Sequence, residues 1–119
     1  MTSSTCRSSG HMVADTAIHV GRCKLISIHG ANFGITAGPT PANNNISIVL
    51  YDNATAASGK IVGQMIVNVG DTGGGSIGKS MEFDMHGVIC HNGLWADVTI
   101  PAGVAGTTGF LSGFTVEFA

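Results

Sequence analysis

The stretch SMEFDMHGVICHNGLWADVTI, residues 80–100, decides the fold class. Over residues 80–86 apolar and polar side chains alternate, with Met81, Phe83 and Met85 on one side. An alternation with a period of two is typical of a β-strand that has one buried face and one solvent face. We therefore expect a strand with these three side chains pointing into a core and the intervening residues pointing to solvent.

The second half of this stretch adds two more strand segments, residues 87–91 and 94–100. They are joined by Asn92-Gly93, and Asn-Gly between two apolar runs is the strongest short signal for a β-hairpin. Trp95, the only tryptophan, alternates with the smaller apolar residues beside it. Its side chain therefore belongs either to the core of a second sheet or to a contact with another protein.

The same alternation recurs on both sides of this stretch, and it predicts strands in residues 17–29, 45–51, 60–69 and 109–118. The expected apolar faces consist of Ile18 and Val20, Ile26 and Ile28, then Ile46, Ile48 and Leu50, then Ile61, Met65, Val67 and Val69, and finally Phe114, Val116 and Phe118. The 18 glycines are spread along the chain and would interrupt any helix. About seven or eight short strands with turn-rich loops predict an all-β domain, a single β-sandwich or jelly roll, over residues 16–119.

Residues 1–15 are polar and show no apolar periodicity. We expect them to form an extended N-terminal arm that contributes little to the core of the domain. Such an arm could reach neighbouring subunits and add main-chain hydrogen bonds at a sheet edge. The residues expected at an interface are Thr5, Arg7, His11, Met12 and Trp95.

Charge is scarce in this chain of 119 residues: 10% are charged and the formal net charge is −2, whereas soluble domains average about 25% charged residues. No basic field is available for a phosphate backbone, so no nucleic-acid partner is expected. No apolar run approaches the ~20 residues of a membrane span, and no secretory signal is visible, so we expect no membrane partner and synthesis in the cytoplasm. The low charge favours a surface that is covered by other subunits.

Residues 73–80, GGGSIGKS, match the phosphate-loop pattern G-x-x-x-x-G-K-[ST]. A phosphate loop needs a helix after its Lys-Ser pair, because the helix N-terminus supplies free N–H groups and a positive dipole end. The residues after Ser80 alternate with a period of two and predict a strand. We therefore expect a glycine-rich connection here, with no nucleotide and no other cofactor.

His86, Cys90 and His91 are candidate metal ligands. On an extended strand His86 and Cys90 share a face but lie about 13 Å apart, and His91 points the other way. The three could meet one metal ion only if the strand bulged at Gly87. We expect no metal site, although a ring of equivalent histidines around a symmetry axis stays open.

Nothing in the sequence points to catalysis. Cys6, Cys23 and Cys90 are odd in number and show no C-x-x-C spacing, so we expect buried or inert thiols. No G-x-S-x-G elbow marks a nucleophile, and the paired carboxylates Glu82 and Asp84 share a solvated strand face. We therefore expect no enzyme and no small-molecule substrate.

Three stretches resemble a known group of proteins: ISIVLYDNATAASGKIV at 46–62, HGVICHNGLWADVT at 86–99 and FTVEFA at 114–119. Together they resemble small β-rich structural proteins of tailed bacteriophages, over about residues 17–119 and without the N-terminal arm. This resemblance implies a virion protein that binds and cements the outside of the capsid, often as a homotrimer. Its partners would be the major capsid protein and copies of itself, it would be made in the host bacterial cytoplasm, and no catalytic residues come with the resemblance.

Two other functions stay open. A tail, adaptor or fibre component of the same particle would share the resemblance and differ in its symmetry. A β-sandwich module that binds a ligand or carbohydrate would need a cluster of exposed aromatic side chains, for which Trp95 and Tyr51 are the candidates.

Overall fold

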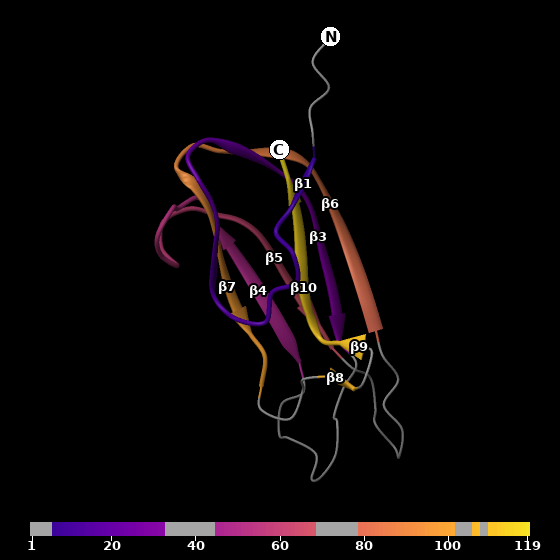
Figure 1. Ribbon diagram of the computed structural model, residues 1–119. Helices are drawn as coiled ribbons and strands as arrows, with labels where there is room; N and C mark the ends of the chain where they lie inside the picture. The colour runs from indigo at the N-terminus through magenta and orange to yellow at the C-terminus, as the bar shows by residue number, and fades with distance from the viewer. Residues whose placement is uncertain (1–5, 33–44, 69–78, 102–105, 108–109) are drawn as a thin grey trace.

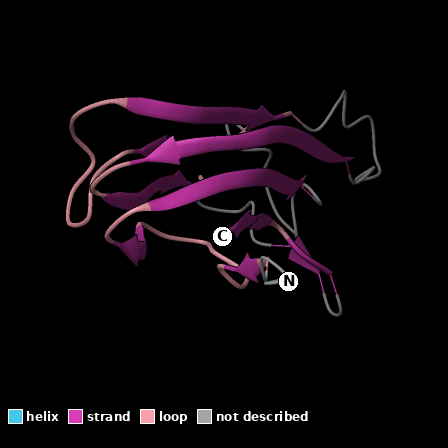
Figure 2. Cartoon of the chain, turned by 90° about the horizontal axis from the view of Figure 1, so that it is seen from above, coloured by secondary structure: helices cyan, strands magenta, loops and turns pink. Residues whose placement is uncertain are grey.

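The computed structural model describes residues 6–32, 45–68, 79–101, 106–107 and 110–119, and these form β-strands without a helix (Figure 1, Figure 2). The strands are β1 (Arg7–Ser8), β2 (Thr16–Val20), β3 (Cys23–Asn32), β4 (Ile46–Tyr51), β5 (Ile61–Val67), β6 (Lys79–Cys90), β7 (Gly93–Thr99), β8 (Gly106–Thr107), β9 (Phe110–Leu111) and β10 (Gly113–Phe118). The first sheet has the order β1-β10-β3-β6, the second has the order β2-β7-β4-β5, and β8 pairs with β9. The prediction of an all-β fold with antiparallel sheets is confirmed.

The strand pairs of the two large sheets are nested within one another. β1 pairs with β10, β2 with β7, β3 with β6, and β4 with β5, all antiparallel. Apart from the step from β4 to β5, each step along the eight strands of the two sheets passes from one sheet to the other. The chain therefore follows the path of one long two-stranded ribbon that is folded over itself.

The core lies between the two sheets, where alternating side chains of both meet. The predicted apolar faces of β4 and β10 are confirmed, because their inward residues are buried: Ile46, Ile48, Leu50, Phe114, Val116 and Phe118. Gly30 of β3 allows this close packing. A Cβ atom at that position would lie 2.8 Å from ring atoms of Phe114 and 2.8 Å from a methyl group of Val67.

Register shifts change the faces of two other strands. A shift between Leu25 and Ser27 of β3 leaves Ile26 only half-buried, whereas Leu25 and Ile28 are buried, so the prediction that Ile26 and Ile28 share a face is wrong. A shift between Ala17 and His19 in β2 leaves Val20 71% exposed. The prediction that Val20 shares a buried face with Ile18 is therefore wrong. A bulge adds a residue on one strand only and so reverses the alternation beyond it.

On β5 the predicted apolar face is confirmed in part. Met65 and Val67 are buried as expected, but Ile61 is 51% exposed. Ile61 pairs with Tyr51 after a register shift between Leu50 and Tyr51. Val69, the last residue of the predicted face, lies outside the described residues.

The predicted hairpin at Asn92-Gly93 is wrong, since β6 and β7 belong to different sheets. The connection between them crosses from sheet to sheet and is held by the carboxylate of Asp52. This carboxylate accepts hydrogen bonds from the backbone N–H groups of His91 (2.9 Å), Asn92 (2.7 Å) and Gly93 (3.3 Å). The first two hydrogen bonds are the largest reasons why the pKa of Asp52 is lowered.

Met81 and Phe83 point toward the inner side of the first sheet, because they pair with Gly30 and Ile28. However, β6 is the last strand of that sheet, and Met81 and Phe83 remain 37% and 39% exposed. Met85 is half-buried and packs against the core. The predicted direction of these side chains is therefore confirmed, whereas their predicted burial is wrong for Met81 and Phe83.

Residues 6–15 lie along the sandwich rather than apart from it. β1 pairs with β10, and Met12 exchanges two backbone hydrogen bonds with Phe114, of 2.8 and 3.0 Å. The side chain of Met12 is buried in the core, with 3% exposed. The prediction that this segment contributes little to the core is therefore wrong; residues 1–5 lie outside the described part of the chain.

Candidate functional site

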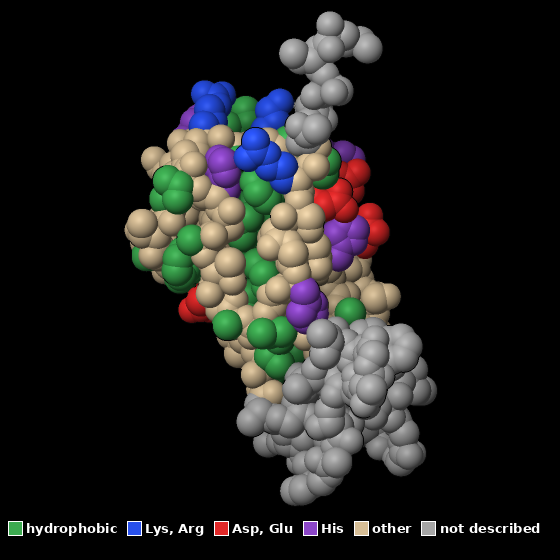
Figure 3. Space-filling view, in the orientation of Figure 1, with side chains coloured by type: hydrophobic (Ala, Val, Ile, Leu, Met, Phe, Trp, Pro, Cys, Tyr) green, Lys and Arg blue, Asp and Glu red, His purple; other side chains and the backbone are tan. Residues whose placement is uncertain are grey.

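The outer face of the first sheet carries polar and ionisable side chains. They stand in two cross-strand rows, because β10, β3 and β6 are paired in register and their alternate residues point outward. One row is Glu117, Ser27 and Asp84, and the other is Thr115, His29 and Glu82. We call this surface the polar face. Figure 3 shows acidic and histidine side chains gathered on the side of the molecule where β6 lies.

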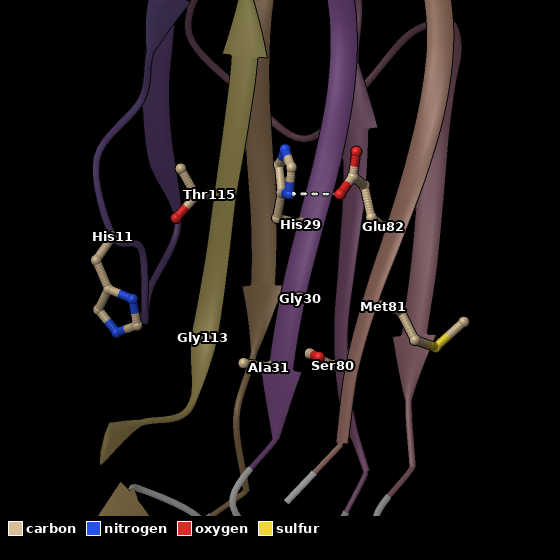
Figure 4. A pocket seen from close by; sticks show the side chains of 9 residues that line it. All are labelled: His11, His29, Gly30, Ala31, Ser80, Met81, Glu82, Gly113 and Thr115. Atoms are coloured by element: carbon tan, nitrogen blue, oxygen red, sulfur yellow. Dashed lines mark ion pairs between the residues drawn. The ribbon is translucent and has the colours of Figure 1, made fainter. Parts of the chain in front are cut away.

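His29 is the centre of the polar face (Figure 4). Its Nε2 lies 2.9 Å from Oε1 of Glu117 and 3.0 Å from Oγ of Ser27, and its Nδ1 lies 3.5 Å from Oε2 of Glu82. Cys6 adds a hydrogen bond of 3.2 Å from its thiol to Oε2 of Glu117. The hydrogen bonds from Cys6 and His29 lower the pKa of Glu117, and the same contact raises the pKa of the Cys6 thiol.

A serine, a histidine and a carboxylate thus lie within reach of one another, as in a hydrolase triad. Ser27 is only 6% exposed, and the imidazole nitrogen that it contacts is also engaged by Glu117. A nucleophile must reach its substrate and must hold the base for itself. This arrangement ties β3 to β10 and does not present a hydroxyl group for attack.

A shallow cavity of about 320 Å³ adjoins this cluster. Figure 4 shows its lining, in which His11, His29, Ser80, Glu82 and Thr115 supply the polar side chains. The imidazole of His11 packs over Gly113, where a Cβ atom would lie 2.6 Å from the ring. Among its described lining residues the cavity offers hydrogen-bonding groups and two imidazoles, but no Phe, Tyr or Trp ring on which a sugar could stack.

The outer face of the second sheet is different, because it is mainly apolar. Trp95 of β7 lies directly opposite Tyr51 of β4, which lies opposite Ile61 of β5. Ile66 of β5 is 63% exposed. It lies opposite Ser47 of β4, which in turn lies opposite Thr99 of β7. We call Val49, Tyr51, Ile61, Ile66 and Trp95 the apolar face.

Charge is sparse around the apolar face. Asp97 stands in the cross-strand row of Val49 and Gln64. Burial, with a smaller contribution from Asp15, raises the pKa of Asp97. A carboxylate that is already partly shielded from water is less costly to cover with a partner than an exposed one would be.

A depression of about 390 Å³ lies where the apolar face meets the edge of the sandwich. It is lined by Val49, Gln64 and Ile66 of the second sheet together with Phe83 of β6. The exposed ring of Phe83 therefore extends the apolar surface around this edge. Both β5 and β6 are terminal strands of their sheets, so unpaired backbone groups are present here as well.

The predicted interface residues do not come together. Trp95 lies on the apolar face, outside the core; its indole Nε1 is enclosed without a hydrogen-bond partner among the described residues. Arg7 and His11 are exposed beside β10, whereas Met12 is buried. Thr5 lies outside the described residues. Sequence reasoning missed Ile61 and Ile66, although apolar residues at outward positions of a strand were a signal.

The structure also places part of the phosphate-loop pattern and the candidate metal ligands. β6 begins at Lys79, so a strand and not a helix follows the Lys-Ser pair, as predicted; residues 73–78 of that motif lie outside the described part. A bulge is present at His86 and Gly87, which have φ angles of 54° and 79°. Even so, the described residues contain no group of three His, Cys, Asp or Glu side chains placed to hold a metal ion.

Comparisons with protein-family models, with curated proteins and with solved structures found no match. Within its described residues the chain also has no helix that meets the length and hydropathy of a membrane span. The fold and its surfaces define the class: an all-β protein of two packed antiparallel sheets, with one polar and one apolar outer face.

Proposed function

We propose that this chain is a structural protein of a tailed-bacteriophage virion. It acts as a capsid decoration protein that binds the outer surface of the head and stabilises the shell. Its partners are the major capsid protein and copies of itself, with which it forms a homotrimer. The apolar face carries this proposal, because Ile61 and Ile66 are exposed and the half-buried Val49, Tyr51 and Trp95 adjoin them on the side of the sheet that is turned away from the core.

We assign the two-sheet fold more finely as a jelly roll, and this topology supports the proposal. Four nested strand pairs in two four-stranded sheets describe a ribbon rolled into a sandwich, and jelly rolls of this kind occur in viral capsid proteins, lectins and cupins. A fold alone does not assign a function. The choice among these classes must therefore come from the surfaces.

Protein interfaces have a core that is poor in charge and rich in aromatic side chains. Tyr51 and Trp95 lie in adjacent strands at the centre of the apolar face, and Ile61 and Ile66 lie on its outer strand. The polar face on the opposite side has Glu82 and Glu117 engaged by His29 and Asp84 beside His86, and it suits contact with water. This division supports an orientation in which the second sheet faces the shell.

The alternatives fit these surfaces less well. A carbohydrate-binding module would need exposed stacking rings, but Tyr51 and Trp95 are only half-buried neighbours on a sheet face, and the described lining of the polar-face cavity has no Phe, Tyr or Trp. A serine hydrolase would need a nucleophile open to substrate, and Ser27 is buried. A tail, adaptor or fibre component could use the same apolar face, and only its location on the particle separates it from a decoration protein.

The direct test is co-sedimentation of the purified protein with heads that lack it. Trp95→Ala should weaken binding by about 30-fold or more, as expected for a central aromatic anchor of at least ~2 kcal/mol. Thr115→Ala on the polar face is the matched control and should bind like the unaltered protein. Equal binding by both variants would show that the apolar face is not the contact surface.

A further inference from the structure

Two cysteines meet at one end of the sandwich. Cys23 at the start of β3 is the direct cross-strand partner of Cys90 at the end of β6. Both thiols are free and both side chains are buried. Paired residues of antiparallel strands have Cα atoms about 4.5–5.5 Å apart, which lies within the range of about 4.4–6.8 Å that a disulfide spans.

We propose that Cys23 and Cys90 form a dithiol pair that closes to a cross-strand disulfide by exchange with an anionic low-molecular-weight disulfide, such as glutathione disulfide. The thiol of Cys90 donates a long hydrogen bond of 4.0 Å to the carbonyl of Val88, and the two thiols lie close enough for each to shift the pKa of the other. No backbone movement that separates β3 from β6 is needed to join them.

The surroundings of Cys23 select the reagent. A depression of about 350 Å³ is lined by Arg22, Cys23, Lys24 and Ala119, so a small molecule can reach the strand beside the buried thiol of Cys23. Arg22 and Lys24 are exposed on either side of it. Two cations at the mouth of this depression attract a negatively charged reagent. Figure 3 shows Lys and Arg side chains gathered at the end of the molecule where the chain has its C-terminus.

The same geometry fixes the order of reaction. Burial raises the pKa of Cys90 to about 12, so its thiol does not start an exchange at neutral pH. Burial is also the largest reason why the pKa of Cys23 is raised, but the neighbouring Cys90 acts in the opposite direction and the depression reaches Cys23 alone of the two. Cys23 is therefore the residue that attacks, slowly, and Cys90 is the residue that resolves.

The step balances as two exchanges. The Cys23 thiolate attacks one sulfur of the small disulfide, which forms a mixed disulfide and releases one small thiolate. Cys90 then loses its proton to solvent and attacks the Cys23 sulfur, which forms the Cys23–Cys90 bond and releases the second small thiolate. Two protein thiols are oxidised and one small disulfide is reduced to two thiols.

The bond would fasten the end of an edge strand. β6 is paired on one side only, and at Cys90 the chain leaves the first sheet for the second. A disulfide between positions that are far apart in the sequence constrains the unfolded chain strongly. The oxidised protein should therefore unfold at a temperature higher by several degrees than the reduced protein.

The test uses the full chain with Cys6→Ser, which removes the exposed thiol. After incubation with glutathione disulfide and alkylation of free thiols, mass spectrometry should show the loss of two hydrogen masses, and a non-reducing peptide map should join Cys23 to Cys90. Cys90→Ala should stop at a stable glutathione adduct on Cys23, whereas folded Cys23→Ala should not react. A Cys23 adduct that persists while Cys90 is present, or two unreacted thiols in the oxidised sample, would overturn the proposal.

Charge selection is tested separately with the same Cys6→Ser protein. Glutathione disulfide should react faster than cystamine, a cationic disulfide, and this preference should fall in Lys24→Gln and Arg22→Gln. The unaltered full-length chain serves as a further sample, because the Cys23–Cys90 peptide link can be sought in it even if a substituted chain fails to fold. Equal rates with both reagents would remove the anionic class from the proposal.

Discussion

Tyr51 and Trp95 lie directly opposite each other on β4 and β7, on the outer face of the second sheet. Their strand neighbours Leu50 and Ala96 are also paired and are fully buried on the inner face. The alternation that fills the core thus also places the only tyrosine and the only tryptophan of the chain side by side on its surface.

Because Trp95 is the only tryptophan, its fluorescence reports on the apolar face alone. We expect its emission to shift to shorter wavelength, and its quenching by acrylamide to fall, when the protein binds to heads. A Trp95→Phe chain that carries Thr115→Trp moves the reporter to the polar face and should show neither change. A response from the relocated reporter, with none from Trp95 in the unaltered chain, would mean that the polar face is the one that is covered.

The Asp52 carboxylate should stabilise the crossing from β6 to β7. Its removal in Asp52→Ala leaves three backbone N–H groups without their acceptor, and we expect a loss of about 1–3 kcal/mol in the free energy of unfolding at pH 7. Glu82→Ala, which removes an exposed carboxylate, should cost less than ~0.5 kcal/mol. Urea denaturation of the two variants measures both values.

The same carboxylate predicts a pH dependence. Its pKa is lowered in the folded protein, so its contribution is present above the unfolded value of about 3.9 and is lost as the pH falls through the lower folded value. The difference in unfolding free energy between the unaltered protein and Asp52→Ala should therefore be constant near neutrality and shrink below about pH 4. The pKa of Glu117 is lowered as well, so the comparison is best made with Glu117→Gln in both chains. A difference that grows on acidification would contradict this role of Asp52.

Two phenylalanines that both point toward the core should differ in their importance. Phe114 is fully enclosed, and Phe114→Ala should cost about 3–5 kcal/mol. Phe83 is 39% exposed on the edge strand, so Phe83→Ala should cost about 1–2 kcal/mol of stability, in proportion to the smaller area that it buries. Chemical denaturation of both variants decides the matter, and equal costs would mean that β6 is covered in the isolated protein.

Met12 should matter for the fold itself. Met12→Ala should cost about 2–5 kcal/mol, since it empties a buried site beside Phe114, whereas the exposed Met81→Ala should cost clearly less. Deletion of residues 1–15 should destabilise the domain in the same direction, because it also removes β1 from the edge of β10. A truncated chain with the thermal stability of the full chain would contradict the packing of this segment.

The sequence allowed the strands to be predicted where the alternation is regular. β4 and β10 were predicted with their buried faces, because an unbroken period of two leaves one choice of face. The register shifts beside Ile26 and Val20 could not be foreseen, because a bulge depends on the partner strand as much as on the strand itself. The polar residues before Thr16 gave no sign of the burial of Met12, which requires the shape of the assembled core.

Long-range strand pairing explains the other differences between the predicted and the observed structure. Asn92-Gly93 is a local hairpin signal, but the hydrogen bonds that hold this connection are accepted by the carboxylate of Asp52, about forty residues earlier in the chain. The exposure of Phe83 follows from the place of β6 at the end of its sheet, and strand order is not encoded in the alternation of a single strand. Of the apolar face, Trp95 was predicted as a contact residue and Tyr51 only as a candidate ligand-binding aromatic, because this face joins strands that are distant in sequence.

The proposed function requires the apolar face to be turned toward the outer surface of a phage head. The measurement that tests it most directly is an electron cryomicroscopy reconstruction of purified particles, with the copies of this chain located and counted. We expect many symmetric copies on the outside of the head, with Tyr51, Ile66 and Trp95 against the shell and His29 and Glu82 in solvent. Copies confined to the tail, particles without the chain, or copies whose polar face contacts the shell would contradict it.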